Sequence, residues 1–346
     1  MSRATSRDIP VAVEAEAEAR DTLLSTYSEL VKARLSSLVL LTTAAGFLVG
    51  GAGSLEWGVL CWTMLGTALA AASAATLNQV LEVERDRRMH RTRRRPLPRG
   101  VVSVPHAAIL GVSLGVVGVV MLALFVNPLT AGLGAANILI YLLLYTPLKT
   151  RSTLNTLIGA ICGAVPPVMG WTAATGSLAG GGWVLGGILF VWQIPHFLAL
   201  AWMYREDYQR GGYRMLPVVD AEGRFTGPVA VLYCLALVPV SLLLTALGHV
   251  GWFYAVGALV LGLLFLVAAV RLRQRLDDRS ARRLFLASIA YLPLLLLLIV
   301  LDRTPMAGGV QLSREPAAQA PIPAAMLSVE PLVGAVRADD SPTDPA

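Results

Sequence analysis

Residues 57–81 read WGVLCWTMLGTALAAASAATLNQVL, a stretch without a charged side chain. An α-helix crosses a bilayer with about 20 mostly apolar residues, so this stretch is long enough to span a membrane. Comparable uncharged runs lie at roughly 35–53, 57–81, 101–126, 129–148, 152–172, 181–204, 225–248, 250–270 and 284–301. They do not alternate in polarity as the strands of membrane barrels do, and in lipid a spanning segment must pair its own backbone groups. The sequence therefore predicts nine transmembrane helices.

The composition of the 346-residue chain also indicates an integral membrane protein. Hydrophobic residues make up 55% and charged residues 14%, against roughly 25% charged residues in an ordinary soluble domain. The mean hydropathy is +0.65. So few charges could not cover the surface of a soluble protein of this size. We interpret the fold class as all-α and the chain as a polytopic membrane protein embedded in the lipid bilayer. We expect it to bind no nucleic acid.

The distribution of positive charge predicts the orientation. Nine spans put the two termini on opposite sides, and of the 28 lysines and arginines all but Arg303, Arg314 and Arg337 fall on the amino-terminal side. Cytoplasmic loops carry the excess of positive charge, so we expect this side to face the cytoplasm across the inner or plasma membrane. Residues 1–24 are polar, and residues 302–346 show no helical period of hydrophobic residues. We expect both ends to be disordered, on either side of a transmembrane domain at 25–301.

Directly after residues 57–81 the chain becomes strongly polar, reading EVERDRRMHRTRRRPLP over residues 82–98. Asn78, Glu82 and Asp86 are spaced four apart, so on a helix they stack along one face. We call these three residues the ladder. Such a ladder can hold one or two hard cations through oxygen ligands. The alternative is that its carboxylates only neutralise neighbouring arginines at the membrane surface, and spacing alone leaves both open.

A second acidic cluster follows the sixth predicted span, on the same side of the membrane. It contains Glu206 and Asp207, flanked by Arg205 and Tyr208. Two acidic clusters beside arginines suit a metal–diphosphate site, because Mg²⁺ bridges carboxylates to phosphate oxygens while arginine neutralises the remaining charge. A belt of charges at the membrane interface is again the alternative.

Two more features carry polar chemistry. Tyr145 and Lys149 are four residues apart, and Lys149 and Arg151 are candidate phosphate contacts. His196 lies within an apolar run, and an ionisable residue inside a membrane indicates function by default. It could bind a metal, ligate a haem iron or relay a proton. The alternative is a neutral histidine hydrogen-bonded to a neighbouring helix.

From about Leu30 to Leu301 the chain resembles the UbiA-type intramembrane prenyltransferases, and within them the branch that acts on protohaem IX, the haem O synthases. Members of the family show an Asn-x-x-x-Asp-x-x-x-Asp ladder followed by M-x-R-T-x-x-R-P-L, as in the ladder and residues 89–97 here. Further runs that resemble the family are YTPLK at 145–149, GAVPPVMGW at 163–171, PHFLALAW at 195–202 and YREDY at 204–208.

The resemblance implies a helical bundle around a central cavity and the transfer of a farnesyl group from farnesyl diphosphate to a vinyl group of protohaem IX, with water added, giving haem O. It implies that the diphosphate and Mg²⁺ lie at a metal site made by Asn78, Glu82, Asp86 and Asp207, which with Lys149 form the catalytic set. The substrate-binding residues would be Arg91, Arg95, Tyr145, Arg151, His196, Tyr204 and Arg205. We expect His196 to line the cavity and contact haem. Haem-modifying or oxidase-assembly proteins are expected partners downstream.

The chain departs from the family pattern in the ladder, where the usual middle aspartate is Glu82. This exchange keeps a carboxylate and lengthens its arm. The broader superfamily has a second Asp-x-x-x-Asp, whereas here Asp207 is followed four residues later by Gly211, as in the haem-directed branch. Two other functions stay open at this point: prenyl transfer to a quinone-ring precursor, and a transporter or scaffold without chemistry.

Overall fold

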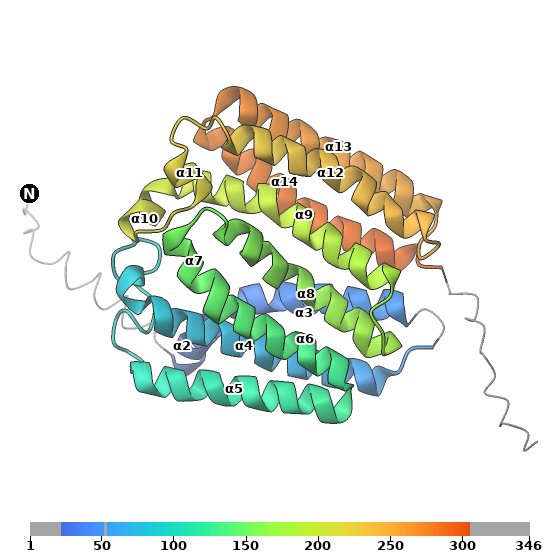
Figure 1. Ribbon diagram of the computed structural model, residues 1–346, viewed down its shortest axis with the longest axis horizontal. Coiled ribbons are helices and arrows are strands. Elements are labelled where there is room, and N and C mark those ends of the chain that lie inside the picture. The colour runs from blue at the N-terminus through green and yellow to red at the C-terminus, as the bar shows by residue number, and fades with distance from the viewer. Residues whose placement is uncertain (1–21, 52–53, 305–346) are drawn as a thin grey trace, which may run out of the picture. The chain divides into compact units, whose positions relative to one another are not determined.

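The computed structural model describes residues 22–51 and 54–304. Within these ranges nine helices are long and apolar enough to cross a membrane and no β-strand forms, so the predicted fold class is confirmed (Figure 1). The spanning helices are α3 (Ala33–Gly50), α4 (Trp57–Asp86), α5 (Val104–Phe125), α6 (Pro128–Leu139) continued by the π-helix η1 (Ile140–Tyr145) and by α7 (Thr146–Arg151), α8 (Asn155–Thr175), α9 (Gly180–Met203), α12 (Thr226–Ala246), α13 (Trp252–Arg275) and α14 (Asp278–Leu301). Three short helices are α2 (Leu23–Leu30), α10 (Arg205–Arg210) and α11 (Leu216–Val219).

Glycines let the helices approach closely where the bundle is tightest. A Cβ atom on Gly46 of α3 would collide with the backbone oxygen of Pro167 in α8, and one on Gly170 of α8 would collide with the backbone oxygen of Thr43 in α3. Small residues at such crossings are the usual basis of helix association in membranes, where lipid removes the hydrophobic driving force. The α3–α8 contact therefore holds these two helices at a short, fixed distance.

Helix α9 packs on α8, α12 and α14 and carries much of the buried apolar core. Two polar side chains of this core donate to backbone oxygens on other helices. The indole of Trp192 donates to the backbone oxygen of Ser288 at 3.0 Å, and the hydroxyl of Tyr254 donates to the backbone oxygen of Ser241 at 3.0 Å. Such pairing removes the cost of leaving polar groups unsatisfied in the bilayer.

The fourth span changes helix type next to the site. Pro147 has no amide hydrogen to donate, and the turn before it widens into η1, in which the amide of Thr146 donates to the oxygen of Tyr141 five residues back. Single π-turns of this kind are frequent at functional sites. The span remains helical through Pro147, which keeps Tyr141, Tyr145 and Lys149 along one side.

The expected disordered ends, residues 1–24 and 302–346, lie mainly outside the described residues. A few residues of each end are described. Helix α2 begins at Leu23, because Thr22 accepts the amide of Ser25 and caps it. Asp302 accepts the amide of Tyr254 at 2.7 Å, which joins it to the start of α13.

Candidate active site

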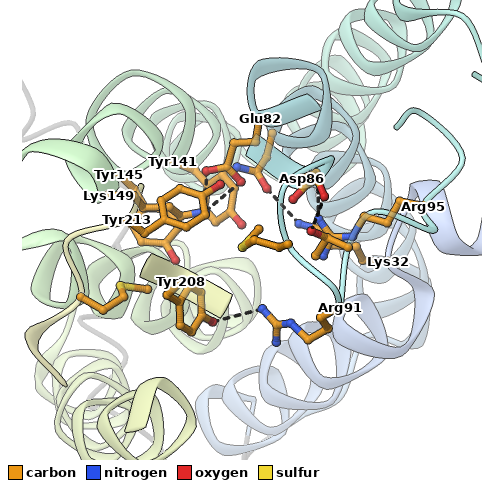
Figure 2. A pocket seen from close by; sticks show the side chains of 14 residues that line it. Lys32, Glu82, Asp86, Arg91, Arg95, Tyr141, Tyr145, Lys149, Tyr208 and Tyr213 are labelled. Atoms are coloured by element: carbon orange, nitrogen blue, oxygen red, sulfur yellow. Dashed lines mark hydrogen bonds and ion pairs between the residues drawn. The ribbon is translucent and has the colours of Figure 1, made fainter. Parts of the chain in front are cut away.

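The ladder lies at the end of the bundle where α7, α10 and α11 gather (left in Figure 1) and lines a pocket of about 130 Å³ (Figure 2). We call it the ladder pocket. Its lining comes from segments far apart in sequence: Lys32, Asn78, Glu82, Asp86, Met89, Arg91, Thr92, Arg95, Tyr141, Tyr145, Lys149, Tyr208, Tyr213 and Met215. The structure thus brings together seven of the predicted site residues, namely Asn78, Glu82, Asp86, Arg91, Arg95, Tyr145 and Lys149.

All three ladder side chains are on α4, which continues one turn past the uncharged run, and all are buried, with exposures of 1%, 4% and 1%. Each has a cationic partner from another segment. The distances are 2.9 Å from Lys32 Nζ to Asn78 Oδ1, 2.9 Å from Lys149 Nζ to Glu82 Oε1 and 2.7 Å from Arg95 Nη1 to Asp86 Oδ2. The ladder is therefore a row of oxygen atoms matched by a row of cations.

Lys32 is held in place by the corner between α2 and α3. Its backbone is left-handed, with φ of 50°, an uncommon conformation for a residue other than glycine. The side chain of Gln79, next to the ladder on α4, donates to the backbone oxygen of Leu30 at 2.6 Å and fixes this corner. The pKa of the Lys32 ammonium is lowered from 10.5 to about 7, first by burial and then by the charges of Arg95 and Lys149. An anion that enters the pocket would favour the charged form of Lys32.

Two tyrosines lie beside Lys149. Its Nζ atom lies 4.5 Å from the ring centre of Tyr145, and the rings of Tyr141 and Tyr145 are 5.0 Å apart. Both rings also line a second, larger cavity of about 220 Å³, the apolar cavity, which extends among α3, α4, α6, α8 and α9. Most of its other lining residues are small or apolar. The two tyrosines therefore separate a polar pocket from an apolar one.

Asp207 does not line the ladder pocket, and the four-residue metal site stays a prediction. It is buried on α10, where its Oδ1 accepts the amide of His90 at 2.7 Å and its Oδ2 accepts the amide of Arg91 at 3.0 Å. Both carboxylate oxygens are thus engaged by the backbone of the loop after α4. Asp207 acts in this structure as a positioning residue for Arg91.

His196 lines neither the ladder pocket nor the apolar cavity, whereas we expected it to line the cavity. Its Nδ1 atom lies 2.7 Å from the hydroxyl of Ser288 on α14, and its ring stacks between those of Trp192 and Phe285. In this structure the ring thus has the hydrogen bond to a neighbouring helix that the alternative expects, and contact with haem stays a prediction. The sequence indicated burial here but not which helix the ring faces.

The remaining predicted substrate-binding residues lie around the site rather than in the ladder pocket. Tyr204 is 40% exposed, and the guanidinium of Arg91 lies 5.1 Å from its ring centre. Arg205 instead pairs with Asp278 at 2.7 Å at the start of α14. Arg151 is exposed at the end of α7. Arg151 and Arg205 therefore have no contact with the ladder in this arrangement.

Sequence reasoning missed several residues that line the ladder pocket. Lys32 had counted only as a flanking positive charge, although it is one of two lysines in the chain. Tyr141 precedes Tyr145 by four residues, a spacing that could have indicated a shared helix face. Tyr213 and Met215 come from the irregular segment between α10 and α11, where no periodic signal exists.

The donor atoms of the ladder fit Mg²⁺ bound together with a phosphate. No group of three or more His, Cys, Asp or Glu side chains forms a metal cluster within residues 22–51 and 54–304. Mg²⁺ is commonly held by one or two carboxylates, with substrate phosphate oxygens and water completing its shell. Glu82 and Asp86 supply two carboxylates, and Asp86 Oδ1 is a buried oxygen without a hydrogen-bond partner among the described atoms.

The fold and the pocket together define a class: an integral membrane protein with a charged pocket, suited to an anionic head group, placed against a cavity suited to an apolar chain. The chain belongs to the UbiA prenyltransferase family, whose match extends over residues 39–292.

Relatives and solved structures agree with this assignment. The chain is 46% identical over 286 residues to the protoheme IX farnesyltransferase of Solibacter usitatus, covering 80% of this chain and 98% of that protein. A solved digeranylgeranylglyceryl phosphate synthase has a TM-score of 0.69 at 18% identity, covering 81% of this chain and 98% of that one. A UbiA homologue from Archaeoglobus fulgidus, solved with GPP and Mg²⁺, has a TM-score of 0.55 at 16% identity, covering 80% and 99%. The two structures share the fold of this chain.

Proposed function

We propose that the protein transfers a farnesyl group from farnesyl diphosphate to a vinyl group of protohaem IX, giving haem O. The observation that carries the chemistry is the junction of the ladder pocket with the apolar cavity at Tyr141 and Tyr145. A prenyl diphosphate has the matching form, with an anionic head and a hydrocarbon chain. The 46% identity to a protoheme IX farnesyltransferase, over almost all of that relative, supports the choice of donor and acceptor.

The diphosphate would take the place of the ladder as the partner of the pocket cations. Lys32, Lys149 and Arg95 each donate to a ladder oxygen in this structure. Phosphate oxygens are strong acceptors for lysine and arginine, so these three side chains would turn toward the head group. Such an exchange would leave Glu82 and Asp86 in need of a new counter-charge.

Mg²⁺ would supply that charge, held by Asn78, Glu82 and Asp86, and when bound it would neutralise the leaving diphosphate. The Archaeoglobus fulgidus homologue was solved with GPP and Mg²⁺. Its likeness to this chain and the oxygen donors of the ladder support a divalent cation at this site.

The residues of the chain would then govern how the donor ionises. The carbon–oxygen bond of farnesyl diphosphate breaks, and its electron pair leaves with the diphosphate toward Lys32, Lys149 and Arg95. The rings of Tyr141 and Tyr145 lie at the junction, where the allylic carbon would sit, and aromatic faces attract positive charge. The apolar cavity would hold the chain and keep water from capturing the allylic cation early.

The acceptor step balances without an oxidant or reductant. The π electrons of the vinyl group form a bond to the farnesyl carbon that carried the diphosphate. The positive charge then lies on the carbon attached to the porphyrin ring. Water adds its oxygen to that carbon and releases one proton, for which the departed diphosphate is an acceptor. The product carries a hydroxyl group and a farnesyl chain.

We also propose that the ladder pocket faces the cytoplasm, in the inner or plasma membrane. The asymmetry of lysine and arginine between the two sides supports this orientation. Haem O, being largely apolar, would remain in the bilayer for a haem-modifying or oxidase-assembly protein to receive.

The proposed function is tested with purified protein by measuring diphosphate release in the presence of Mg²⁺ and farnesyl diphosphate. We expect release to require protohaem IX and to produce a farnesylated porphyrin. Release that requires a quinone-ring precursor instead would establish the rival acceptor. Absence of release with every acceptor, in protein that binds protohaem and is folded, would contradict an enzymatic role.

A further inference from the structure

Arg91 differs from the other cations of the ladder pocket. Lys32, Lys149 and Arg95 each bond to a ladder side chain, whereas the side chain of Arg91 forms no ion pair with any acidic side chain of the described residues. Its Nη2 atom donates to the hydroxyl of Tyr208 at 3.1 Å, and its guanidinium lies over the rings of Tyr204 and Tyr208. Arg91 is therefore a fixed cation whose guanidinium has no direct ion pair among the described residues, although the nearby Asp207 carboxylate also favours its charge.

Arg91 lies between the ladder pocket and another cavity. Besides the ladder pocket it lines a third cavity of about 140 Å³, the side cavity, between the start of α8, the end of α9 and α10. The side cavity has a largely apolar and aromatic wall that includes Tyr145, Phe197, Leu200, Tyr208 and Met215. Tyr145 also borders the ladder pocket and the apolar cavity, so a molecule in the side cavity reaches the junction where the donor would ionise.

The local structure holds Arg91 at this place. Asp207 accepts the amides of His90 and Arg91 with its two oxygens, which fixes the loop after α4 against α10. Stacking against two tyrosine rings then sets the direction of the guanidinium. An arginine held in this way is pre-organised to bind a planar carboxylate through two parallel hydrogen bonds.

We infer that Arg91 and the side cavity bind the carboxylate edge of the acceptor, with the body of the acceptor lying against the aromatic wall. The inference rests on the proposed function, since protohaem IX has a flat macrocycle with propionate groups at one edge. Flat rings pack favourably on Tyr145, Phe197 and Tyr208, and the propionates need a cation that the diphosphate does not claim. Arg91 thereby selects the acceptor rather than the donor.

The test compares protohaem IX with its dimethyl ester, in which the propionates are neutral, in wild type, Arg91→Gln and Arg95→Gln. Binding is followed by absorbance titration without donor, and the KM for each substrate is then measured. In wild type the ester should bind roughly 10-fold to 100-fold more weakly than the free acid, as expected for loss of a charged hydrogen bond. Arg91→Gln should weaken binding of the free acid by a similar factor and abolish the difference in affinity between acid and ester. Arg95→Gln, the matched control, should raise the KM for farnesyl diphosphate and keep the difference.

A wild-type protein that binds acid and ester equally would overturn the inference, and this comparison needs no variant to fold. Arg91→Gln that keeps the wild-type difference, or raises only the KM for farnesyl diphosphate, would assign Arg91 to the donor and also overturn it. Asp207→Asn should reduce the acid–ester difference in part, because it loosens the loop but leaves the guanidinium. If wild type turns over no protohaem at all, the proposed function fails, whereas the binding comparison still decides whether Arg91 recognises a carboxylate.

Discussion

The Nζ atom of Lys149 lies 2.9 Å from Oε1 and 3.1 Å from Oε2 of Glu82, although 67 positions separate the two residues. Both side chains are largely buried, with exposures of 11% and 4%, so water screens this pair only weakly. Removing one partner of such a buried pair strongly destabilises the protein, because the other charge is left uncompensated. The pair joins α7 to α4 at the point where the proposed donor loses its diphosphate.

Glu82→Gln should therefore lower turnover by about 100-fold or more, since it removes a proposed metal ligand and leaves Lys149 unpaired. Glu82→Asp restores the residue usual in the family and should stay within about 10-fold of wild type. Steady-state turnover and thermal stability of both variants check this. Equal loss in the two variants would show that the length of the side chain matters more than its charge.

Asp86→Asn should abolish most activity and leave membrane insertion intact. The change removes the charge that pairs with Arg95 and that a divalent cation would need, in a side chain only 1% exposed. Glu84→Gln is the matched control, because the Glu84 side chain is 69% exposed and pairs with Arg87 outside the pocket. Turnover is measured across a Mg²⁺ titration. Near-normal activity of Asp86→Asn at limiting Mg²⁺ would remove the ladder from the metal site.

Met169→Ala should admit a longer prenyl chain. Among the residues lining the apolar cavity, Thr67 is the one on α4 farthest along the helix from Asn78, by about 16 Å at 1.5 Å per residue. Met169 and Gly134 line the cavity too, and the methyl of Met169 would lie 3.2 Å from a Cβ on Gly134. A Cβ on Gly66, next to Thr67, and one on Gly134 would both contact Leu122, so Met169 fills space at the end of the cavity opposite the ladder.

The measurement for Met169→Ala is the ratio of kcat/KM for geranylgeranyl diphosphate to that for farnesyl diphosphate. We expect this ratio to rise by roughly 10-fold or more, the scale of discrimination in apolar pockets. Val168→Ala is the control, because Val168 is buried beside Met169 but does not line the cavity. An unchanged ratio in Met169→Ala, or an equal rise in Val168→Ala, would refute a cavity end at Met169.

The orientation is tested by introducing one cysteine at a time in a background where the exposed Cys61 is replaced by alanine and the buried Cys162 and Cys234 are kept. Cysteine at Glu222 or Ser103 should react with an impermeant reagent only from the cytoplasmic side, and cysteine at Ser177 only from the opposite side. All three positions are exposed in the structure. Reaction of the Ser177 position from the cytoplasmic side alone would contradict the proposed orientation.

Most of the fold could be predicted because the bilayer imposes it: an uncharged run of sufficient length can only be a helix there. The ladder was also predictable, because it follows helical spacing within one segment. Its partners were not, since Lys32 and Lys149 come from positions 46 and 67 residues away. The role of Asp207 depends on backbone amides of a distant loop, and the direction of His196 depends on which helix packs beside it. Neither leaves a periodic signal in the sequence.

The most direct test of the central proposal is the mass of the porphyrin product formed from protohaem IX, farnesyl diphosphate and Mg²⁺ in ¹⁸O-labelled water. We predict a product heavier than protohaem by one farnesyl group and one hydroxyl, with one labelled oxygen, and none of it with Asp86→Asn. Unmodified protohaem, despite a folded wild-type protein that binds both substrates, would contradict the account, and so would a farnesylated product without labelled oxygen.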